Sequence, residues 1–175
     1  NGDGEISDDD RTYVGDAQPD LTFGWQNNFT WKNWDFSFFF RGTIGNKVLN
    51  NPRAAYANNT YLIGTNALDD ELTYTMKESS RVCSYYLENG SFIRLDNLAL
   101  GYTFDTKKIN WLDKARLYFA AQNLFVITGY KGLDPEVELF RGESSDTDAG
   151  LSPGIEPRQF FPKARTFTLG VNLTF

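Results

Sequence analysis

The sequence contains no histidine and a single cysteine, Cys83, among its 175 residues. Histidine is the most frequent general base and a common metal ligand, so its absence excludes histidine-based hydrolase triads and histidine-ligated zinc sites. One cysteine cannot form a disulfide within the chain. The sequence also lacks any run of about 18 consecutive apolar residues, which excludes a transmembrane helix.

Positive charge is scarce, because 17 lysines and arginines stand against 23 aspartates and glutamates and give a formal net charge of −6. No basic run interleaved with aromatic residues occurs, so the sequence gives no support for nucleic-acid binding. No nucleophile motif accompanies the carboxylates. We therefore expect a protein that is not an enzyme.

Aromatic residues, in contrast, make up 16% of the chain, and 15 residues are phenylalanine. Aromatic side chains are favoured in β-strands and in the belts where proteins meet a membrane interface. The chain starts with neither a methionine nor a signal peptide, so we expect a mature chain that is a fragment of a longer protein.

Five segments alternate apolar and polar residues with a period of two, the pattern of strands with one apolar face. The last, Arg165 to Phe175, is eleven residues long and matches the roughly 9–11 residues that a tilted strand needs to cross a bilayer. Lys32 and Asn33 predict a tight connection between the first two strands. The five predicted strands are residues 21–31, 34–42, 91–104, 115–128 and 165–175.

The connections between these strands alternate between short and long, with long polar regions at about 45–90 and 129–164. Porin-type barrels combine short turns on one side with long loops on the other. Structureless loops above about 12–15 residues are uncommon in compact soluble domains. The pattern favours a membrane barrel, and a β-sandwich stays open as the alternative.

Several stretches resemble the C-terminal end of SusC/RagA-type TonB-dependent transporters, the outer-membrane nutrient importers of the Bacteroidetes. Three of them are "YYLENGSFIRLDNLALGYTF", "LYFAAQNLFVITGYKGLDPEV" and "FPKARTFTLGVNLTF". The opening "NGDGEISDDDRTYVGDAQPDLTFGWQNNFTWKNWDFSFFFRGTIGNKVLN" resembles the segment that precedes them in that family. The resemblance is weakest over residues 58–82 and 140–156.

This resemblance implies an all-β fold, in which residues 21–175 supply the last five antiparallel transmembrane strands of a 22-stranded β-barrel with long extracellular loops. Residues 1–20 form an acidic lead-in that resembles a calcium loop. The implied function is import of oligosaccharides or oligopeptides across the outer membrane with a SusD-like surface lipoprotein. Contact with the TonB system is implied through an N-terminal part outside this chain. The residues that bind substrate stay unknown.

On this interpretation, one face of the last strand contacts outer-membrane lipid and the other faces the lumen. The terminal aromatic residue of such a strand also resembles the signal that the barrel-assembly machinery reads. The predicted lipid-facing residues are Phe167, Leu169, Val171, Leu173 and Phe175.

Three arginines, Arg41, Arg94 and Arg116, fall within predicted strands. A charge facing lipid at the middle of the membrane would cost roughly 2–4 kcal/mol. We therefore expect these side chains to point inward or to lie near an interface, with Asp35 and Asp96 as their partners.

The opening "NGDGEISDDD" matches most of the calcium-loop motif, entered two residues late. It makes calcium the candidate cofactor, although the first ligand would precede Asn1 and the last is aspartate rather than the usual glutamate. The alternative is an acidic turn held by hydrogen bonds between side chains and backbone. The candidate ligands are Asn1, Asp3, Glu5, Ser7 and Asp10.

A second acidic segment, "YKGLDPEV", could bind a cation or sugar hydroxyls through Asp134, Glu136 and Glu138. Gly132 and Pro135 favour a structural turn instead. Aromatic residues in the long loops could stack on sugars, pack on a partner or pin the loops. They are Tyr56, Tyr61, Tyr74, Phe140, Phe160 and Phe161.

The alternative function is a soluble, calcium-dependent β-sandwich module that recognises glycans with its loop aromatics. It would require the apolar strand faces to bury one another. Such a module should be monomeric without detergent, whereas unclosed strands with exposed apolar faces should aggregate.

Overall fold

The computed structural model describes residues 9, 11–57, 64, 66, 68–69, 83–107, 109, 111–137, 153–158 and 161–175. The chain divides into two compact units, which we call the strand unit and the loop unit. The strand unit is Leu21–Ile44, Phe92–Thr128 and Lys163–Phe175, and the loop unit is Asn1–Asp20, Gly45–Ser91 and Gly129–Pro162. Within the described residues, no helix has the length and apolar character needed to cross a membrane.

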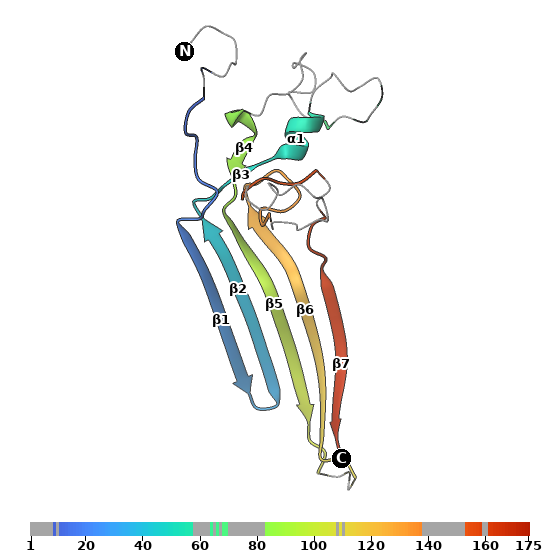
Figure 1. Cartoon of the computed structure of the whole chain (residues 1–175). Helices are drawn as coiled ribbons and strands as arrows, with labels where there is room; N and C mark the ends of the chain where they lie inside the picture. The colour runs from blue at the N-terminus through green and yellow to red at the C-terminus, as the bar shows by residue number, and fades with distance from the viewer. Residues whose placement is uncertain are drawn as a thin grey trace. The chain divides into compact units, whose positions relative to one another are not determined.

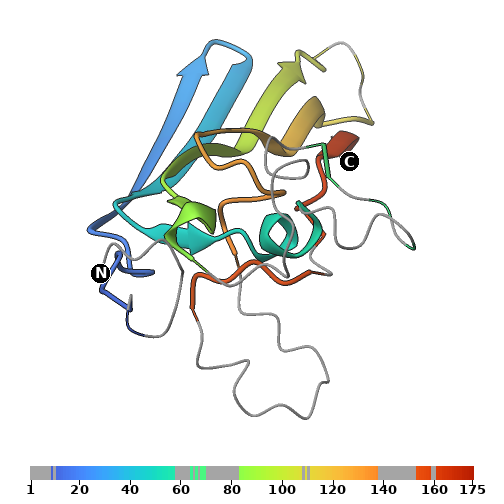
Figure 2. The same cartoon turned by 90° about the horizontal axis from the view of Figure 1, so that it is seen from above.

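The strand unit is a single five-stranded antiparallel sheet (Figure 1). Its strands follow one another across the sheet in their chain order, as Figure 2 also shows from above. This confirms the predicted antiparallel all-β structure, and each predicted strand lies within two residues of its observed bounds. The strands are β1 (Leu21–Trp31), β2 (Trp34–Ile44), β5 (Phe92–Phe104), β6 (Lys114–Thr128) and β7 (Thr166–Thr174).

The register of the sheet brings aromatic side chains together on one face. Trp25 of β1 lies opposite Phe40 of β2, with their ring centroids 6.1 Å apart. Near the turn between these strands, Trp34 contacts Tyr102 of β5 at 4.7 Å between centroids. Such cross-strand aromatic pairs each add a fraction of a kcal/mol and specify the register.

The predicted tight connection between β1 and β2 is confirmed at Lys32 and Asn33. Lys32 adopts a left-handed backbone conformation with φ of 53°, as short hairpin turns require. Asn33 holds the turn against β5, because its Nδ2 donates to the carbonyl of Thr103 at 2.8 Å and its own carbonyl accepts from Thr103 N at 2.8 Å.

A β-bulge at Asp96 interrupts the alternation in β5. Leu95 pairs with Phe40 and Leu98 pairs with Phe38 of β2, with the register shifted between them. One residue is therefore inserted, and the apolar face passes from odd positions to even positions of β5. Without this bulge, half of the strand would turn its apolar residues to the polar face.

The loop unit contains short elements inside the first long polar region of the sequence. Strands β3 (Lys47–Leu49) and β4 (Leu87–Asn89) pair antiparallel, and a 3₁₀ helix η4 (Ser84–Tyr86) precedes β4. The helix α1 (Asn51–Tyr56) begins after Asn50, whose side chain accepts from Arg53 N at 3.0 Å. Asparagine caps and proline in the first turn are ordinary helix-start signals.

Strand β3 is the centre of the loop unit, because segments from distant parts of the sequence bind to it. Leu49 N donates to the carbonyl of Gly154 at 2.7 Å, and Glu156 N donates to the carbonyl of Leu49 at 3.0 Å. Lys47 N donates to the carbonyl of Asp16 at 2.7 Å. Val48, at the middle of β3, is 1% exposed.

Candidate functional site

Two parts of the described chain are candidates for function: the two faces of the sheet in the strand unit, and a buried polar cluster in the loop unit. The sheet presents an apolar face and a polar face, as the alternation in the sequence predicts. The polar cluster was not predicted from the sequence.

The apolar face carries the residues predicted to contact lipid. In β7 and just after it, these side chains are 48 to 73% exposed. Exposure of this extent is rare for a contiguous set of apolar side chains, and marks a surface that meets a partner or a membrane. The set is Phe167, Leu169, Val171, Leu173 and Phe175.

Aromatic residues gather where β7 ends and the connection between β5 and β6 turns. Trp111 stacks on Phe175 with ring centroids 5.7 Å apart. Tyr102 contacts Phe104 edge to face at 4.9 Å. Amphipathic aromatic side chains are enriched at the level where a membrane protein meets the lipid headgroups.

The polar face contains an ion pair that lies flat across the sheet. Arg116 Nε of β6 donates to Asp35 Oδ1 of β2 at 2.9 Å and passes over Gly101 of β5. The guanidinium lies 5.2 Å from the ring of Tyr118, and this ring covers Gly170 of β7. Any side chain at either glycine would occupy the space of these groups and displace them, so glycine permits this close approach.

Both aspartates expected as arginine partners form an ion pair. Besides the Asp35 pair, Arg41 Nε lies 3.3 Å from Asp96. The guanidinium of Arg94 donates to the side-chain oxygen of Asn123. Arg94 is 1% exposed, and this hydrogen bond joins it to the neighbouring strand β6.

Asn123 itself holds the start of the last strand. It has a left-handed backbone with φ of 51°, at a register irregularity between β5 and β6. Its Nδ2 donates to the carbonyl of Lys163 at 2.6 Å. One asparagine therefore connects β5, β6 and the chain that leads into β7.

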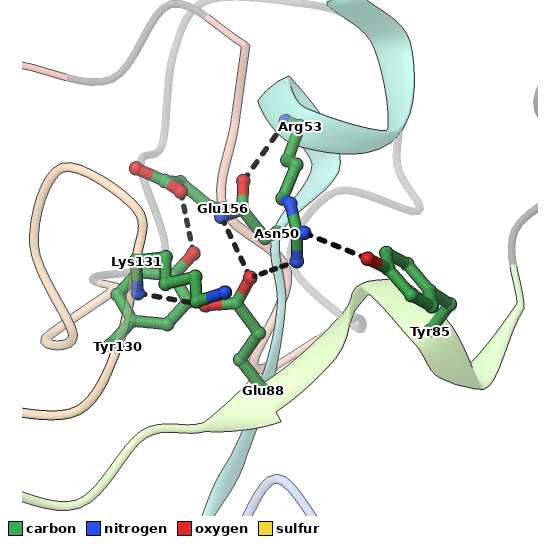
Figure 3. Close-up of polar contacts among 7 residues, drawn as sticks. All are labelled: Asn50, Arg53, Tyr85, Glu88, Tyr130, Lys131 and Glu156. Atoms are coloured by element: carbon green, nitrogen blue, oxygen red, sulfur yellow. Dashed lines mark hydrogen bonds and ion pairs between the residues drawn. The ribbon is translucent and has the colours of Figure 1, made fainter. Parts of the chain in front are cut away.

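In the loop unit, two glutamates bind the same short segment (Figure 3). Glu88 of β4 accepts from Lys131 N at 2.8 Å, and Glu156 accepts from Leu133 N at 3.0 Å. The hydroxyl of Tyr130 also donates to Glu156 at 2.5 Å. We call this arrangement the carboxylate clamp, because it fixes residues 129–133 by two alternate backbone amides and one hydroxyl.

The clamp is continuous with helix α1 through Arg53. Its guanidinium donates to Glu88 at 3.1 Å and to the hydroxyl of Tyr85 at 3.2 Å, and it lies 4.9 Å from the Tyr85 ring. Asn50 Nδ2 donates to Glu88 at 3.3 Å. The side chains of Arg53 and Glu88 are only 9% and 11% exposed, so this is a buried ion pair.

Burial changes the titration of two clamp residues. Burial raises the pKa of the Glu156 carboxyl; the nearby carboxylates of Glu88 and Asp134 add to the rise, and the hydrogen bonds from Tyr130 and Leu133 oppose it. Burial also raises the pKa of the Tyr130 hydroxyl, and its hydrogen bond to Glu156 acts in the same direction. The tyrosine therefore stays a donor at physiological pH.

A cavity of about 360 Å³ opens beside the clamp. It is lined by the cap and residues of α1, by two residues that follow α1 in the chain, by the clamped segment and by Glu156. These residues are Asn50, Pro52, Arg53, Tyr56, Leu68, Asp69, Lys131, Gly132, Leu133 and Glu156.

Of the two acidic segments singled out in the sequence, the structure describes only the second. The candidate calcium ligands Asn1, Asp3, Glu5, Ser7 and Asp10 lie outside the described residues. In "YKGLDPEV", the buried Asp134 accepts from Glu136 N at 2.9 Å and forms the turn that Pro135 favours. Glu138 is outside the described part.

The four residues that make the clamp and its ion pair, Arg53, Glu88, Tyr130 and Glu156, were missed in the sequence. They come from four separate segments, and Tyr130 lies in "YKGLDPEV", a segment singled out only for its carboxylates. Only the helix start was readable, because Asn50 followed by Pro52 is a cap signal within a region that otherwise resembled a loop.

Comparison with curated proteins finds similarity along the whole chain, while no family model matches it. TonB-dependent receptor P3 of Formosa agariphila is 36% identical over 188 residues, which cover 99% of this chain and 18% of the receptor. TonB-dependent receptor SusC of Bacteroides thetaiotaomicron is 30% identical over 189 residues, covering 100% of this chain and 17% of SusC. The chain thus spans less than a fifth of these relatives.

Comparison with solved structures also finds similarity along nearly the whole chain. The RagAB peptide importer in its closed-closed state matches with a TM-score of 0.76 and 25% identity, over 98% of this chain and 19% of the importer chain. Its open-open state gives a TM-score of 0.75. These relatives are receptors and importers and not enzymes, which confirms the expectation drawn from the missing catalytic residues.

Proposed function

Because the chain belongs to the SusC/RagA-type TonB-dependent receptors, of which it spans less than a fifth, we propose that it forms part of the wall of an outer-membrane importer. The importer takes up oligosaccharides or oligopeptides with energy delivered through the TonB system. A SusD-like surface lipoprotein captures substrate together with the outer loops. The chain itself supplies wall strands and loops.

The observation that carries this proposal is the exposed apolar face of an antiparallel sheet whose strands are long enough to cross a bilayer. The strands have 9 to 15 residues, and a tilted membrane strand needs roughly 9–11. The ion pairs lie on the opposite face of the sheet, where they avoid the cost of a charge in lipid. We propose that the five strands are the last five of a closed 22-stranded barrel.

The loop unit is proposed to lie on the extracellular side. Its two long segments follow β2 and β6, and the short connections follow β1 and β5. In outer-membrane barrels, short turns are periplasmic and long loops extracellular. Calcium binding by residues 1–10 of the lead-in is part of the proposal for the intact protein, and would fix these residues before β1.

The β-sandwich alternative receives less support. A sandwich needs a second sheet that buries the apolar face, yet the apolar residues of β7 are 48 to 73% exposed. The relatives are also receptors of a membrane family.

The test places a fluorophore on either face of the same strand in the full-length receptor. Cys83 is replaced by serine, and bimane is attached at Val171→Cys or at Asn172→Cys. In liposomes, brominated lipid should quench the Val171→Cys label, while the Asn172→Cys label should respond weakly. Equal quenching at both positions would contradict the orientation of the wall. TonB-dependent uptake of labelled oligosaccharides and oligopeptides by cells then tests import.

A further inference from the structure

The cavity beside the carboxylate clamp has the properties of a small-ligand site. Its volume of about 360 Å³ falls within the range of about 300–1,000 Å³ that is usual for such sites. At about 30 Å³ for each water-sized group, it has room for about twelve non-hydrogen atoms. It also adjoins Glu156, whose burial raises its pKa, and perturbed titratable groups are more frequent at functional sites.

The buried polar groups at this cavity are already engaged within the protein. The oxygen of Asn50 caps α1, and Arg53 binds Glu88 and Tyr85. Glu156 accepts from Tyr130 and Leu133. These groups therefore form the floor of the cavity, and a ligand need not supply their hydrogen bonds.

The walls above this floor are largely apolar and accessible. Leu133 is 58% exposed, Leu68 is 45% exposed and Tyr56 is 39% exposed, and Pro52 completes the lining. An aliphatic side chain placed against them would remove apolar surface from water on both partners, at about 25 cal/mol for each square ångström buried.

Two lining residues of opposite charge are unengaged. In the part of the chain that the structure describes, the ammonium of Lys131 and the carboxylate of Asp69 form no ion pair, with each other or with another residue. Only the backbone of Lys131 is used, by Glu88. The cavity thus offers one cation and one anion to a ligand.

We propose that this cavity binds the end of a short peptide, with an aliphatic side chain on the walls of Pro52 and Leu133, a carboxylate on Lys131 and an ammonium on Asp69. A zwitterionic ligand matches one free charge of each sign, whereas a neutral glycan uses neither and needs many hydrogen-bond partners. The inference rests on the proposed function and narrows its cargo to oligopeptides at this site.

The test uses the full-length receptor in detergent and the dipeptide glycyl-leucine, which has both termini free. Three further probes are N-acetyl-glycyl-leucine, glycyl-leucine amide and maltose. Binding is measured by saturation-transfer NMR and titration. The unmodified receptor should prefer the free dipeptide over either blocked form by about three- to fivefold, the effect of one partly exposed ion pair, and should not bind maltose at this site.

Two variants assign the charges. In Lys131→Gln, the free acid and the amide should bind equally well, while the preference for the free amine stays. In Asp69→Asn, the reverse should hold. Lys107→Gln serves as the matched control, because Lys107 is an exposed lysine in the strand unit, and it should leave every affinity unchanged.

Equal binding of the free and blocked dipeptides, displacement by maltose, or no binding of any probe would each overturn this inference. TonB-dependent uptake is measured separately in cells. Uptake of oligosaccharides without discrimination among the dipeptides would overturn the peptide site and leave the importer standing. Charge-selective dipeptide binding without any TonB-dependent uptake would support the peptide site and contradict the proposed function.

Discussion

Removal of the Glu88 carboxylate should release the segment held by the carboxylate clamp. Glu88 accepts from three groups in two segments: Asn50 and Arg53 at the start of α1, and Lys131 N. In Glu88→Ala, the 9% exposed side chain of Arg53 loses its ion pair with Glu88. Loss of one partner from a buried ion pair costs about 3–5 kcal/mol.

The structure places this cost at the lower end of that range. Arg53 retains its hydrogen bond to the Tyr85 hydroxyl and its contact with the Tyr85 ring. Lys131 is exposed, so water can replace the carboxylate at its amide. We therefore expect about 3 kcal/mol of destabilisation, confined to the loop unit, which corresponds to a more than hundredfold increase in local opening.

Hydrogen exchange in the full-length receptor measures this directly. The amides of residues 129–133 should exchange more than a hundredfold faster in Glu88→Ala, while those of β5 and β6 should not change. The matched control is Asp105→Ala, whose ion pair with Lys107 is exposed and worth at most about 1 kcal/mol. Unchanged exchange at 129–133 in Glu88→Ala would refute the assignment of the clamp.

Three further predictions concern other groups. Because burial raises the folded-state pKa of Glu156 above its unperturbed value of 4.5, its stabilising contribution is fully present below about pH 4.5 and is lost as the pH rises through the folded pKa. Loop-unit protection should therefore increase on acidification, and Glu156→Gln should remove that part of the pH dependence; an unchanged profile would contradict this. On the apolar face, Leu169→Arg should destabilise the intact receptor in lipid by about 2–4 kcal/mol and Thr168→Arg by much less, measured by the midpoint of urea unfolding in liposomes. Equal midpoint shifts would show that the faces are wrongly assigned. On the polar face, Gly170→Val should displace the Tyr118 ring and lower the midpoint, whereas the double change with Tyr118→Ala should restore most of it; additive losses would rule out a shared contact.

The strands were readable from the sequence because one face of each is apolar, so that burial or lipid contact imposes a period of two. This pattern also gave the face of each residue in β7. The alternation does not continue through the bulge in β5, where Asp96 and Asn97 are consecutive polar residues. Two adjacent polar positions within an alternating strand are what an inserted residue produces.

The partner of each arginine was only partly predictable. Opposite charges in neighbouring strands made Asp35 and Asp96 reasonable partners, and both ion pairs form. The hydrogen bond between Arg94 and Asn123 depends on the register irregularity at Asn123. A sequence does not reveal such an offset between two strands, since it follows from pairing and not from composition.

The carboxylate clamp could not be predicted from local pattern at all. Its members are separated by long stretches of sequence. They come together because β3 forms hydrogen bonds with the lead-in, with β4 and with the segment around Gly154. A single buried glutamate leaves no periodic pattern in the sequence. Only three-dimensional packing tells them from the many carboxylates that remain in solvent.

The β3–β4 ladder also has a consequence for how such loops can vary. Its pairing of Lys47 with Asn89, continued by the hydrogen bond from Gly90 N to the carbonyl of Asn46 at 2.9 Å, forms a closed neck a few residues from the ends of β2 and β5. Insertions or deletions beyond the neck change the loop-closure entropy by only about 0.6 kcal/mol for each doubling of length. Related proteins could therefore differ in the tip of this loop without any change in the register of β2 against β5.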